Sequence, residues 1–82
     1  MIRPPTDRQL EILRLRCQLG LSLSQIAAQL GIRRNSVGML AAVAATRLIR
    51  SEPTPENAGD RDLALAHYPE IAARFAKPAG GE

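Results

Sequence analysis

Apolar residues recur over the first fifty positions at the three- to four-residue spacing that is typical of amphipathic helices. The pattern predicts three helices, over residues 7–19, 23–30 and from 33 or 34 to about 50. Gly20 and Gly31 follow the first two helices, at positions where a left-handed residue commonly ends a helix. Two capping boxes mark their starts, Thr6 with Gln9 and Ser22 with Gln25. The sequence therefore predicts an all-α fold with a three-helix core.

The first predicted helix is apolar on two nearly opposite sides. Each side forms a stripe at helical spacing, with Leu10, Leu13 and Cys17 on one and Ile12, Leu15 and Leu19 on the other. A helix with a single buried side would not need both stripes. We therefore expect the second stripe to be covered, either by the C-terminal segment or by another subunit.

The third predicted helix has one wide apolar face and an outer face of mixed character. We expect the apolar face to be buried, and it holds Val37, Leu40, Ala41, Ala44 and Leu48. The outer face holds Asn35, Met39, Ala42, Thr46 and Arg50. Beyond its first turn this outer face has few hydrogen-bonding groups, so we expect it to meet either DNA or the apolar surface of a protein.

The second half of the chain divides by composition. Residues 51–59 contain prolines, a glycine and polar residues, which is typical of a linker after a core over 1–50. Residues 60–76 predict two short helices, one with Asp60 as N-cap that runs to about His67 and one that starts at Pro69. Residues 77–82 read as a flexible tail. The apolar anchors of this C-terminal segment are Leu63, Ile71 and Phe75, which suit either core covering or dimerisation.

Composition narrows the class of protein. Cys17 is the only cysteine, which favours a reducing bacterial cytoplasm and excludes a cysteine-based zinc site. No signal peptide and no apolar run of about 20 residues is visible. Tyr68 and Phe75 are the only aromatic residues, which is too few for the stacking platforms of single-strand nucleic-acid binding. We expect a protein without metal or cofactor.

Charge is distributed unevenly along the chain. Residues 1–50 carry eight arginines against two acidic residues, a net charge of +6. Residues 51–82 carry three basic and six acidic residues, a net charge of −3. A concentrated positive charge favours approach to a polyanion.

Residues 23–40 satisfy the steric rules of a helix-turn-helix. Two helices that cross closely need a small residue at the crossing and a glycine in the turn, and here these are Ala27 and Gly31. No proline interrupts the segment. The apolar positions that would lock the two helices together are Ile26, Leu30, Ile32, Val37 and Leu40.

The stretch from Thr6-Asp-Arg-Gln-Leu-Glu-Ile-Leu to Gly20-Leu-Ser-Leu-Ser-Gln-Ile-Ala-Ala-Gln-Leu-Gly-Ile resembles the helix-turn-helix of LuxR-type regulators and of region 4 of sigma factors. The segment that starts at Ser22, followed by Arg34-Asn35 and Val37, is also similar to the N-terminal motif of GcrA-type regulators. The resemblance covers about residues 6–45 and implies DNA binding, transcriptional control and RNA polymerase or a sigma factor as a partner. The chain departs from the LuxR-type pattern at Gly38 and Met39, where a polar residue is common and where a glycine would let a backbone approach closely.

The start of the third helix is where a helix-turn-helix reads bases in the major groove. Arginine pairs with guanine or grips phosphate, and asparagine pairs with adenine. The candidates for base readout are Arg33, Arg34, Asn35, Ser36 and Met39, the last through a thymine methyl group. For Asn35 the alternative is a helix-start residue that satisfies backbone N–H groups. The candidates for phosphate contacts are Ser22, Ser24, Gln25, Arg47, Arg50 and Arg3.

So few base contacts favour a homodimer, because each good bidentate contact contributes only about 1–3 kcal/mol of discrimination. The apolar residues expected at the dimer interface are Ile12, Leu15, Leu19, Leu63, Ile71 and Phe75. We expect a sequence-specific transcriptional regulator of bacterial or mobile-element origin, a repressor rather than an activator, although both use this fold. The alternative is a protein-interaction module that docks on RNA polymerase, or a phage or plasmid accessory factor such as a DNA-packaging subunit. An enzyme is not expected, because His67 is the only histidine and no catalytic cluster accompanies it.

Overall fold

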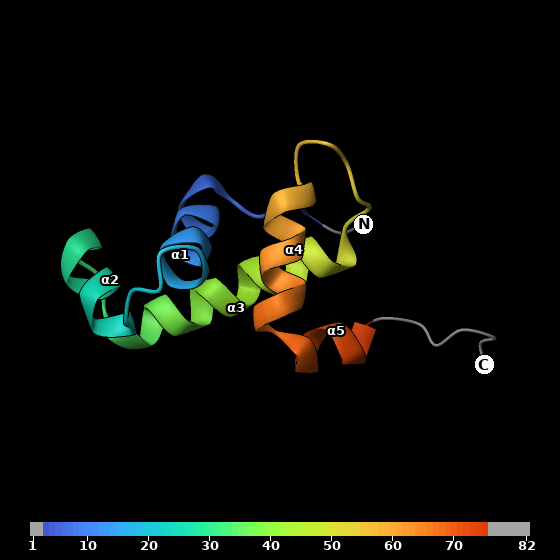
Figure 1. The fold of residues 1–82 in the computed structure, drawn as a ribbon. Helices are drawn as coiled ribbons and strands as arrows, with labels where there is room; N and C mark the ends of the chain where they lie inside the picture. Colours follow the sequence, from blue (N-terminus) through green and yellow to red (C-terminus); the bar gives the residue numbers. More distant parts are fainter. Residues whose placement is uncertain (1–2, 76–82) are drawn as a thin grey trace.

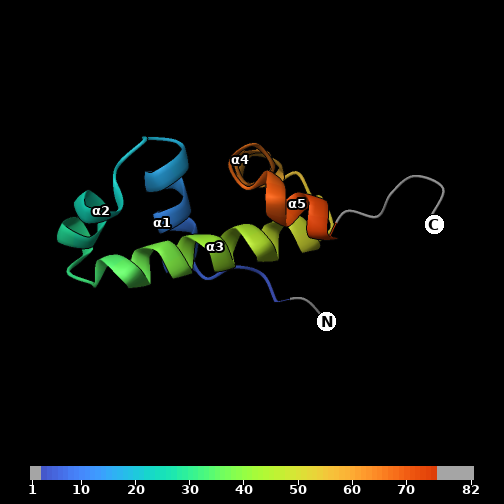
Figure 2. The same cartoon turned by 90° about the horizontal axis from the view of Figure 1, so that it is seen from below.

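The computed structural model describes residues 3–75, and these form five α-helices and no strands. The all-α prediction is therefore confirmed. The longest helix, α3, forms the base on which the other four pack (Figure 1). Figure 2 shows α1, α2 and α4 on one side of α3, with α2 near its first residues and α4 near its last. The bounds are α1 (Asp7–Cys17), α2 (Leu23–Leu30), α3 (Arg34–Arg50), α4 (Ala58–His67) and α5 (Pro69–Phe75).

Both predicted capping boxes are present. The Gln9 N–H donates to Thr6 Oγ1 at 3.2 Å, and the Thr6 N–H donates to Gln9 Oε1 at 3.0 Å. The corresponding distances at the start of α2, between Ser22 and Gln25, are 3.1 and 2.8 Å. These reciprocal bonds satisfy N–H groups that a helix start otherwise leaves free, so both helices begin where the sequence predicts.

The end of α1 differs from the prediction. The helix stops at Cys17 rather than at Leu19, and Gly20 follows in the left-handed region with φ +72°. The N–H of Leu19 donates to Arg14 O at 3.1 Å, and that of Leu21 donates to Leu15 O at 3.1 Å. The chain therefore leaves the helix before Gly20, and the side chain of Leu19 is 66% exposed.

Two buried clusters enclose α1 from opposite sides. The Leu13 side of α1 packs against the second half of α3 and against α4, in a cluster of Leu13, Ala44, Ala45, Leu48, Ile49 and Ala64. The Ile12 side packs against α2 and the first half of α3, in a cluster of Ile12, Ile26, Val37 and Ala41. The prediction of a buried apolar face on α3 is confirmed, with Leu40 half-buried and Ala45 and Ile49 added to it.

Except at the exposed Leu19, both stripes of α1 are thus covered within one chain, and this corrects the predicted dimer interface at Ile12. Ile12 has no exposed surface, so it is not available to a second subunit. Leu15 is half-buried against the α2 side of the core. The C-terminal segment was one of two alternatives expected to cover the stripe of Ile12, Leu15 and Leu19, and it packs instead against the stripe of Leu10, Leu13 and Cys17.

The start of α4 corrects the predicted N-cap. The helix begins at Ala58 with Asn57 as N-cap, so residues 58 and 59 belong to a helix and not to the linker. Thr54 and Asn57 form a reciprocal pair, in which the Thr54 N–H donates to Asn57 Oδ1 at 2.8 Å and the Asn57 N–H donates to Thr54 Oγ1 at 3.1 Å. Asp60 instead lies in the first turn of α4, 9% exposed, with its carboxylate directed to Arg14 of α1.

The end of α3 is tied to α4 by an arginine. Arg61 Nε donates to Leu48 O at 3.0 Å, and its Nη2 donates to Ile49 O at 3.4 Å. The last carbonyl groups of a helix lack partners within the helix, and a cation there also favours the helix dipole. Arg61 therefore stabilises the end of α3 and positions α4 at the same time.

The last described helix begins at Pro69, as predicted, and is described as far as Phe75. Ile71 packs against the Leu13 cluster and so contributes to this chain's own core, and Leu63 is half-buried. Phe75 remains 37% exposed. The predicted last residue of this helix, at 76, and the predicted tail over 77–82 lie outside the described residues.

Candidate nucleic-acid interface

The first turn of α3 differs from those of α1 and α2 because no side chain caps it. Its N-cap is Arg33, with extended backbone (φ −72°, ψ 144°) and no side-chain cap hydrogen bond. No acidic residue lies in the first turn either. An uncapped helix start leaves backbone N–H groups free at the positive end of the helix dipole, which favours an anion there.

Three polar side chains are exposed at this uncapped start. Arg33, Arg34 and Asn35 are all exposed, and Ser36 is half-buried. None of them has a hydrogen-bond or ion-pair partner among residues 3–75. Asn35 lies inside the helix and does not cap it, so the alternative role considered for it from the sequence is not the one it has here. Asn57, by contrast, uses its amide oxygen in the turn before α4.

Packing against α2 fixes where this turn lies. Gly31 is left-handed with φ +68°, and Ile32 and Arg33 complete the short connection from α2 to α3. Ile26 and Val37 are fully buried between the two helices, and Ala41 is 1% exposed. The start of α3 is therefore held against a small rigid core while its polar side chains project into solvent.

The arginines of the described residues divide by whether they have a partner. Arg14 hydrogen-bonds to Asp60, Arg16 to Leu21 O, Arg47 to Gln9 and Arg61 to carbonyl groups of α3. Arg8 lies 3.9 Å from Glu11, and the guanidinium of Arg50 lies 4.8 Å from the centre of the Phe75 ring. The arginines left without a partner within residues 3–75 are Arg3, Arg33, Arg34 and Arg74.

The sequence offered no signal for the pairing of Arg14. Glu11 lies three positions before Arg14, a spacing at which two side chains of one helix can pair. In the structure Glu11 pairs with Arg8 instead, and Arg14 hydrogen-bonds to Asp60, 46 positions away. Arg16 Nη1 donates to Leu21 O at 2.9 Å and so holds the turn between α1 and α2.

The predicted phosphate contacts lie on several elements. Ser22 and Gln25 use their side-chain oxygens in the capping box, which leaves the hydroxyl and the amide NH₂ able to donate outward. Ser24 is exposed beside them, on the first turn of α2. Arg47 and Arg50 lie three turns or more beyond the start of α3, on its outer side. Arg3 is exposed ahead of α1.

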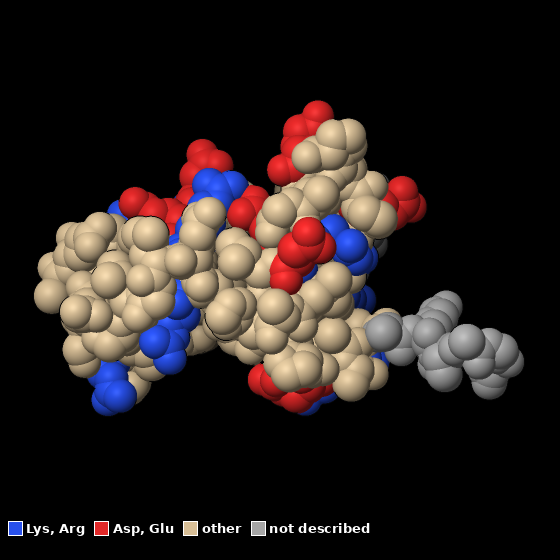
Figure 3. All heavy atoms as spheres, in the orientation of Figure 1, with Lys and Arg blue, Asp and Glu red and all other residues tan. Residues whose placement is uncertain are grey.

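Figure 3 shows how charge is arranged on one face of the molecule. Basic atoms form separate groups, one of them at the end where α2 and α3 meet, and the surface of α2 between them carries little charge. Acidic atoms lie over the start of α1 and the loop before α4, and further groups lie on α4 and at the bottom of the view near α5. Positive charge on this face is therefore local to a few positions and does not form a continuous basic surface.

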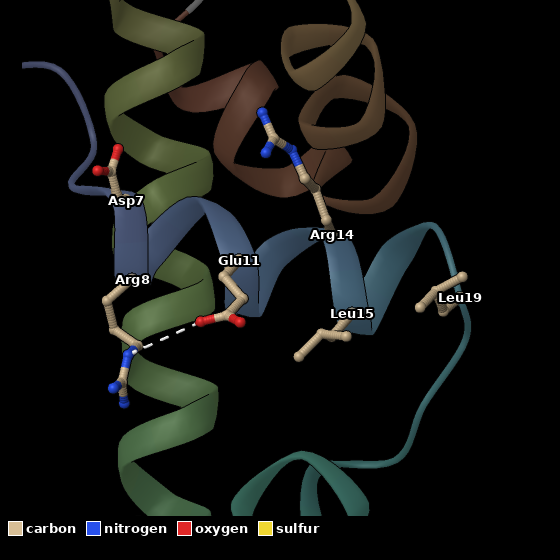
Figure 4. Close-up of a pocket in the computed structure, with 6 residues that line it drawn as sticks. All are labelled: Asp7, Arg8, Glu11, Arg14, Leu15 and Leu19. Atoms are coloured by element: carbon tan, nitrogen blue, oxygen red, sulfur yellow. Dashed lines mark ion pairs between the residues drawn. The ribbon is translucent and has the colours of Figure 1, made fainter. Parts of the chain in front are cut away.

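Two surface hollows of the described structure are not lined by side chains arranged for catalysis or metal binding. One of about 530 Å³ lies along α1 and is lined by Asp7, Arg8, Glu11, Arg14, Leu15 and Leu19 (Figure 4). Within it Arg8 pairs with Glu11, and Arg14 points away toward α4. The other, of about 370 Å³, is lined by Arg16, Cys17, His67 and Tyr68.

The thiol in the second hollow is not activated. Burial raises the pKa of Cys17, with Arg16 opposing the effect, so the thiol stays protonated near neutral pH. Burial and the neighbouring Cys17 likewise raise the pKa of Tyr68. Within residues 3–75 no three His, Cys, Asp or Glu side chains are grouped so that they could hold a metal ion.

No family model, curated protein or solved structure matches the chain. Among the described helices, none combines the length and apolar character needed to cross a bilayer. Function is therefore inferred from the residues and their geometry.

Proposed function

We propose that this chain binds double-stranded DNA, with α2 and α3 as a helix-turn-helix and the first turn of α3 in the major groove. One observation carries the proposal. Helices α1 and α2 both begin with capping boxes, whereas α3 begins with two arginines and an asparagine whose side chains have no partner within residues 3–75. A helix start that lacks its own cap and presents free N–H groups with cationic side chains is suited to a polyanion.

The packing of α2 on α3 supports the helix-turn-helix assignment. Helix α2 has eight residues, a left-handed glycine follows it, and three residues separate it from α3. Ala27 is half-buried at the contact, next to the buried Ile26. A small residue at the crossing and a glycine in the turn are the features that this motif requires.

The chemistry at the start of α3 suits base readout. Arg33 and Arg34 each have a free guanidinium, which can donate two parallel hydrogen bonds to guanine O6 and N7. The Asn35 amide can both donate to and accept from adenine. Ser24 and the free donors of Ser22 and Gln25 lie at the start of α2, where they can grip phosphate and fix the position of the protein on the duplex.

A transcriptional regulator, as a repressor, is the use of DNA binding that we propose. Arg33, Arg34 and Asn35 provide only about 1–3 kcal/mol of discrimination each. Two copies on a two-fold site would double the number of contacts, so the homodimer remains part of the proposal. Ile12 is buried, and of the residues predicted at the dimer interface the exposed ones are Leu19, at 66%, and Phe75, at 37%.

The test is selection of bound duplexes from a random DNA library at near-physiological salt, with the Asn35→Ala and Arg34→Ala variants selected in parallel. We expect the parent chain to enrich one motif, a palindrome if it binds as a dimer. Each variant should lose preference at one or two positions of that motif. Arg74→Ala is the matched control, because Arg74 is also exposed and without a partner in the described structure but lies on α5.

Two results would overturn the proposal. The first is that no motif is enriched, and that weak binding disappears as salt is raised, as it does for non-specific electrostatic association. The second is that Arg74→Ala changes the motif as much as Arg34→Ala does.

A further inference from the structure

The outer side of α3 carries a second surface, separate from its first turn. Figure 2 shows α1, α2 and α4 packed on the opposite side of this helix. An open groove of about 360 Å³ runs along the outer side, lined at helical spacing by Met39, Ala42, Val43, Thr46, Arg47 and Arg50. Met39 is 59% exposed, although a side chain of this size and apolar character is commonly buried.

The floor of this groove is apolar. Thr46 supplies the only hydroxyl between Met39 and Arg47, and its Oγ1 donates to Ala42 O at 2.8 Å. That bond directs the hydroxyl hydrogen back to the helix, so the floor has no free side-chain donor. Ala42 and Val43 are small and half-buried, which allows another helix to come close to the backbone of α3.

One end of the groove is cationic, and both cations are held in place by neutral groups. Arg47 Nη1 donates to the amide oxygen of Gln9 at 3.0 Å. The guanidinium of Arg50 lies over the Phe75 ring, 4.8 Å from its centre. Neither arginine forms an ion pair within residues 3–75. Their positive charge is therefore uncompensated and preorganised, which favours a carboxylate brought by a partner.

We propose that this groove binds an amphipathic α-helix of another protein, with an apolar stripe over Met39, Ala42 and Val43 and acidic side chains that pair with Arg47 and Arg50. Recognition of this kind places an apolar helix face in a groove and fixes its direction by charge at one end. The proposal does not depend on DNA binding, because the groove starts beyond the first turn of α3.

Two other occupants suit the groove less well. A second copy of α3 would bring more arginines, because Arg34–Arg50 contains no acidic residue. DNA bases are read mainly through hydrogen bonds, and between Met39 and Arg47 the groove floor has no free side-chain donor, which leaves little beyond a contact of Met39 with a thymine methyl group. The helix is also about 25 Å long at 1.5 Å per residue. A major groove about 8.5 Å deep therefore accommodates only part of it when it enters by its first turn.

The experiment selects displayed amphipathic helical peptides on the full chain, with the Met39→Glu variant as the counter-target. An enriched peptide is then synthesised and its dissociation constant is measured for each variant. We expect enriched peptides to carry Asp or Glu at one end of their apolar stripe. Met39→Glu and Arg50→Gln should each weaken binding about tenfold.

Matched controls separate this site from general surface effects. Leu65→Glu places the same charge on an exposed leucine of α4, and Arg74→Gln removes an arginine of α5. Both should leave the dissociation constant within about twofold of the parent value, since substitutions away from a hot spot have small effects. Circular dichroism melts of all four variants establish that each one is folded.

Several results would overturn the proposal. In the peptide selection these are a lack of enrichment over the counter-target and enriched peptides without acidic residues. Among the variants they are equal losses in the control variants and loss of a concentration-dependent dimer in Met39→Glu. A further contrary result would be that Met39→Glu and Arg50→Gln reduce duplex binding as much as Arg34→Ala does, because the groove would then face DNA.

Discussion

Arg14 of α1 holds the carboxylate of Asp60 on α4 through two hydrogen bonds, Nε to Oδ1 at 2.9 Å and Nη2 to Oδ2 at 2.7 Å. Asp60 is 9% exposed, whereas the side chain of Arg14 is 49% exposed. The hydrogen bond to Asp60 raises the pKa of Arg14, so the guanidinium keeps its positive charge. This bidentate pair joins the C-terminal segment to the first helix.

Asp60→Ala should lower the free energy of unfolding by about 1–3 kcal/mol, the range for hydrogen bonds to a charged group. The lower part of that range is expected, because water screens the exposed side of Arg14. Urea denaturation followed by circular dichroism measures the change. Asp62→Ala is the control, since Asp62 is exposed on the same helix, and it should change stability by less than about 0.5 kcal/mol. Equal losses in the two variants would show that the pair contributes nothing beyond local charge.

Local features of the fold could be predicted from the sequence because each depends on residues only a few positions apart. The capping boxes at Thr6 and Ser22, the turn at Gly31 and the buried face of α3 all follow from spacing within one or two helical turns. The pairing of Arg14 with Asp60 could not be predicted, because it joins residues 46 positions apart and depends on how α4 folds back.

Two predictions were wrong, one for a local reason and one for a tertiary reason. Aspartate is a common N-cap residue, which favoured Asp60 in the sequence. In the structure Thr54 and Asn57 form two reciprocal hydrogen bonds before it, and the helix starts at Ala58. Ile12 was assigned to a dimer interface because α1 is apolar on two sides. The choice between a partner subunit and the rest of the chain is a matter of tertiary packing, and α2 and α3 cover Ile12. At the candidate site, the sequence identified Arg33, Arg34 and Asn35, but only the structure shows that they have no partner within residues 3–75.

The stability of the fold should fall at alkaline pH because of Cys17 and Tyr68. Burial raises the pKa of both groups in the folded chain, so it opposes the loss of their protons. The unfolded chain releases these protons at the ordinary values of about 8.5 for Cys and 10 for Tyr, and it then binds fewer protons than the folded chain. This contribution is fully present below those values and is lost as pH rises through the folded pKa values.

The measurement is urea unfolding at a series of pH values between neutral and about 10.5. We expect the double variant Cys17→Ala/Tyr68→Phe to lose less stability over this range than the parent chain does. The comparison uses the slope with pH, so a loss of packing at neutral pH does not affect it. Parallel slopes would contradict the assignment of the alkaline loss to these two groups.

Gly38→Ala should stabilise the protein, although glycine at this position suggested a close approach of backbone. Gly38 lies inside α3 with negative φ, and a Cβ built there meets Leu23 Cδ1 at 3.7 Å, an ordinary van der Waals contact. Alanine in a helix interior is favoured over glycine by about 0.5–1 kcal/mol. We therefore expect a higher urea midpoint for Gly38→Ala.

Gly31→Ala is the matched control for this substitution, because φ at Gly31 is +68° and a side chain there is strained. It should lower the free energy of unfolding by about 1–2 kcal/mol. A destabilised Gly38→Ala variant would indicate that α2 packs closer to α3 than the 3.7 Å contact implies.

Variants of Arg33 test whether this residue lowers the stability of the fold while it contributes to DNA binding. It occupies the N-cap position, where serine is strongly preferred and arginine supplies no cap hydrogen bond. Arg33→Ser should therefore raise the free energy of unfolding, by about 0.5–1 kcal/mol relative to Arg33→Ala. Both variants should weaken binding to a selected duplex to a similar extent, because both remove the guanidinium. If Arg33→Ser is more stable and binds the duplex as well as the parent chain does, Arg33 lies outside the DNA interface and the uncapped start of α3 needs another explanation.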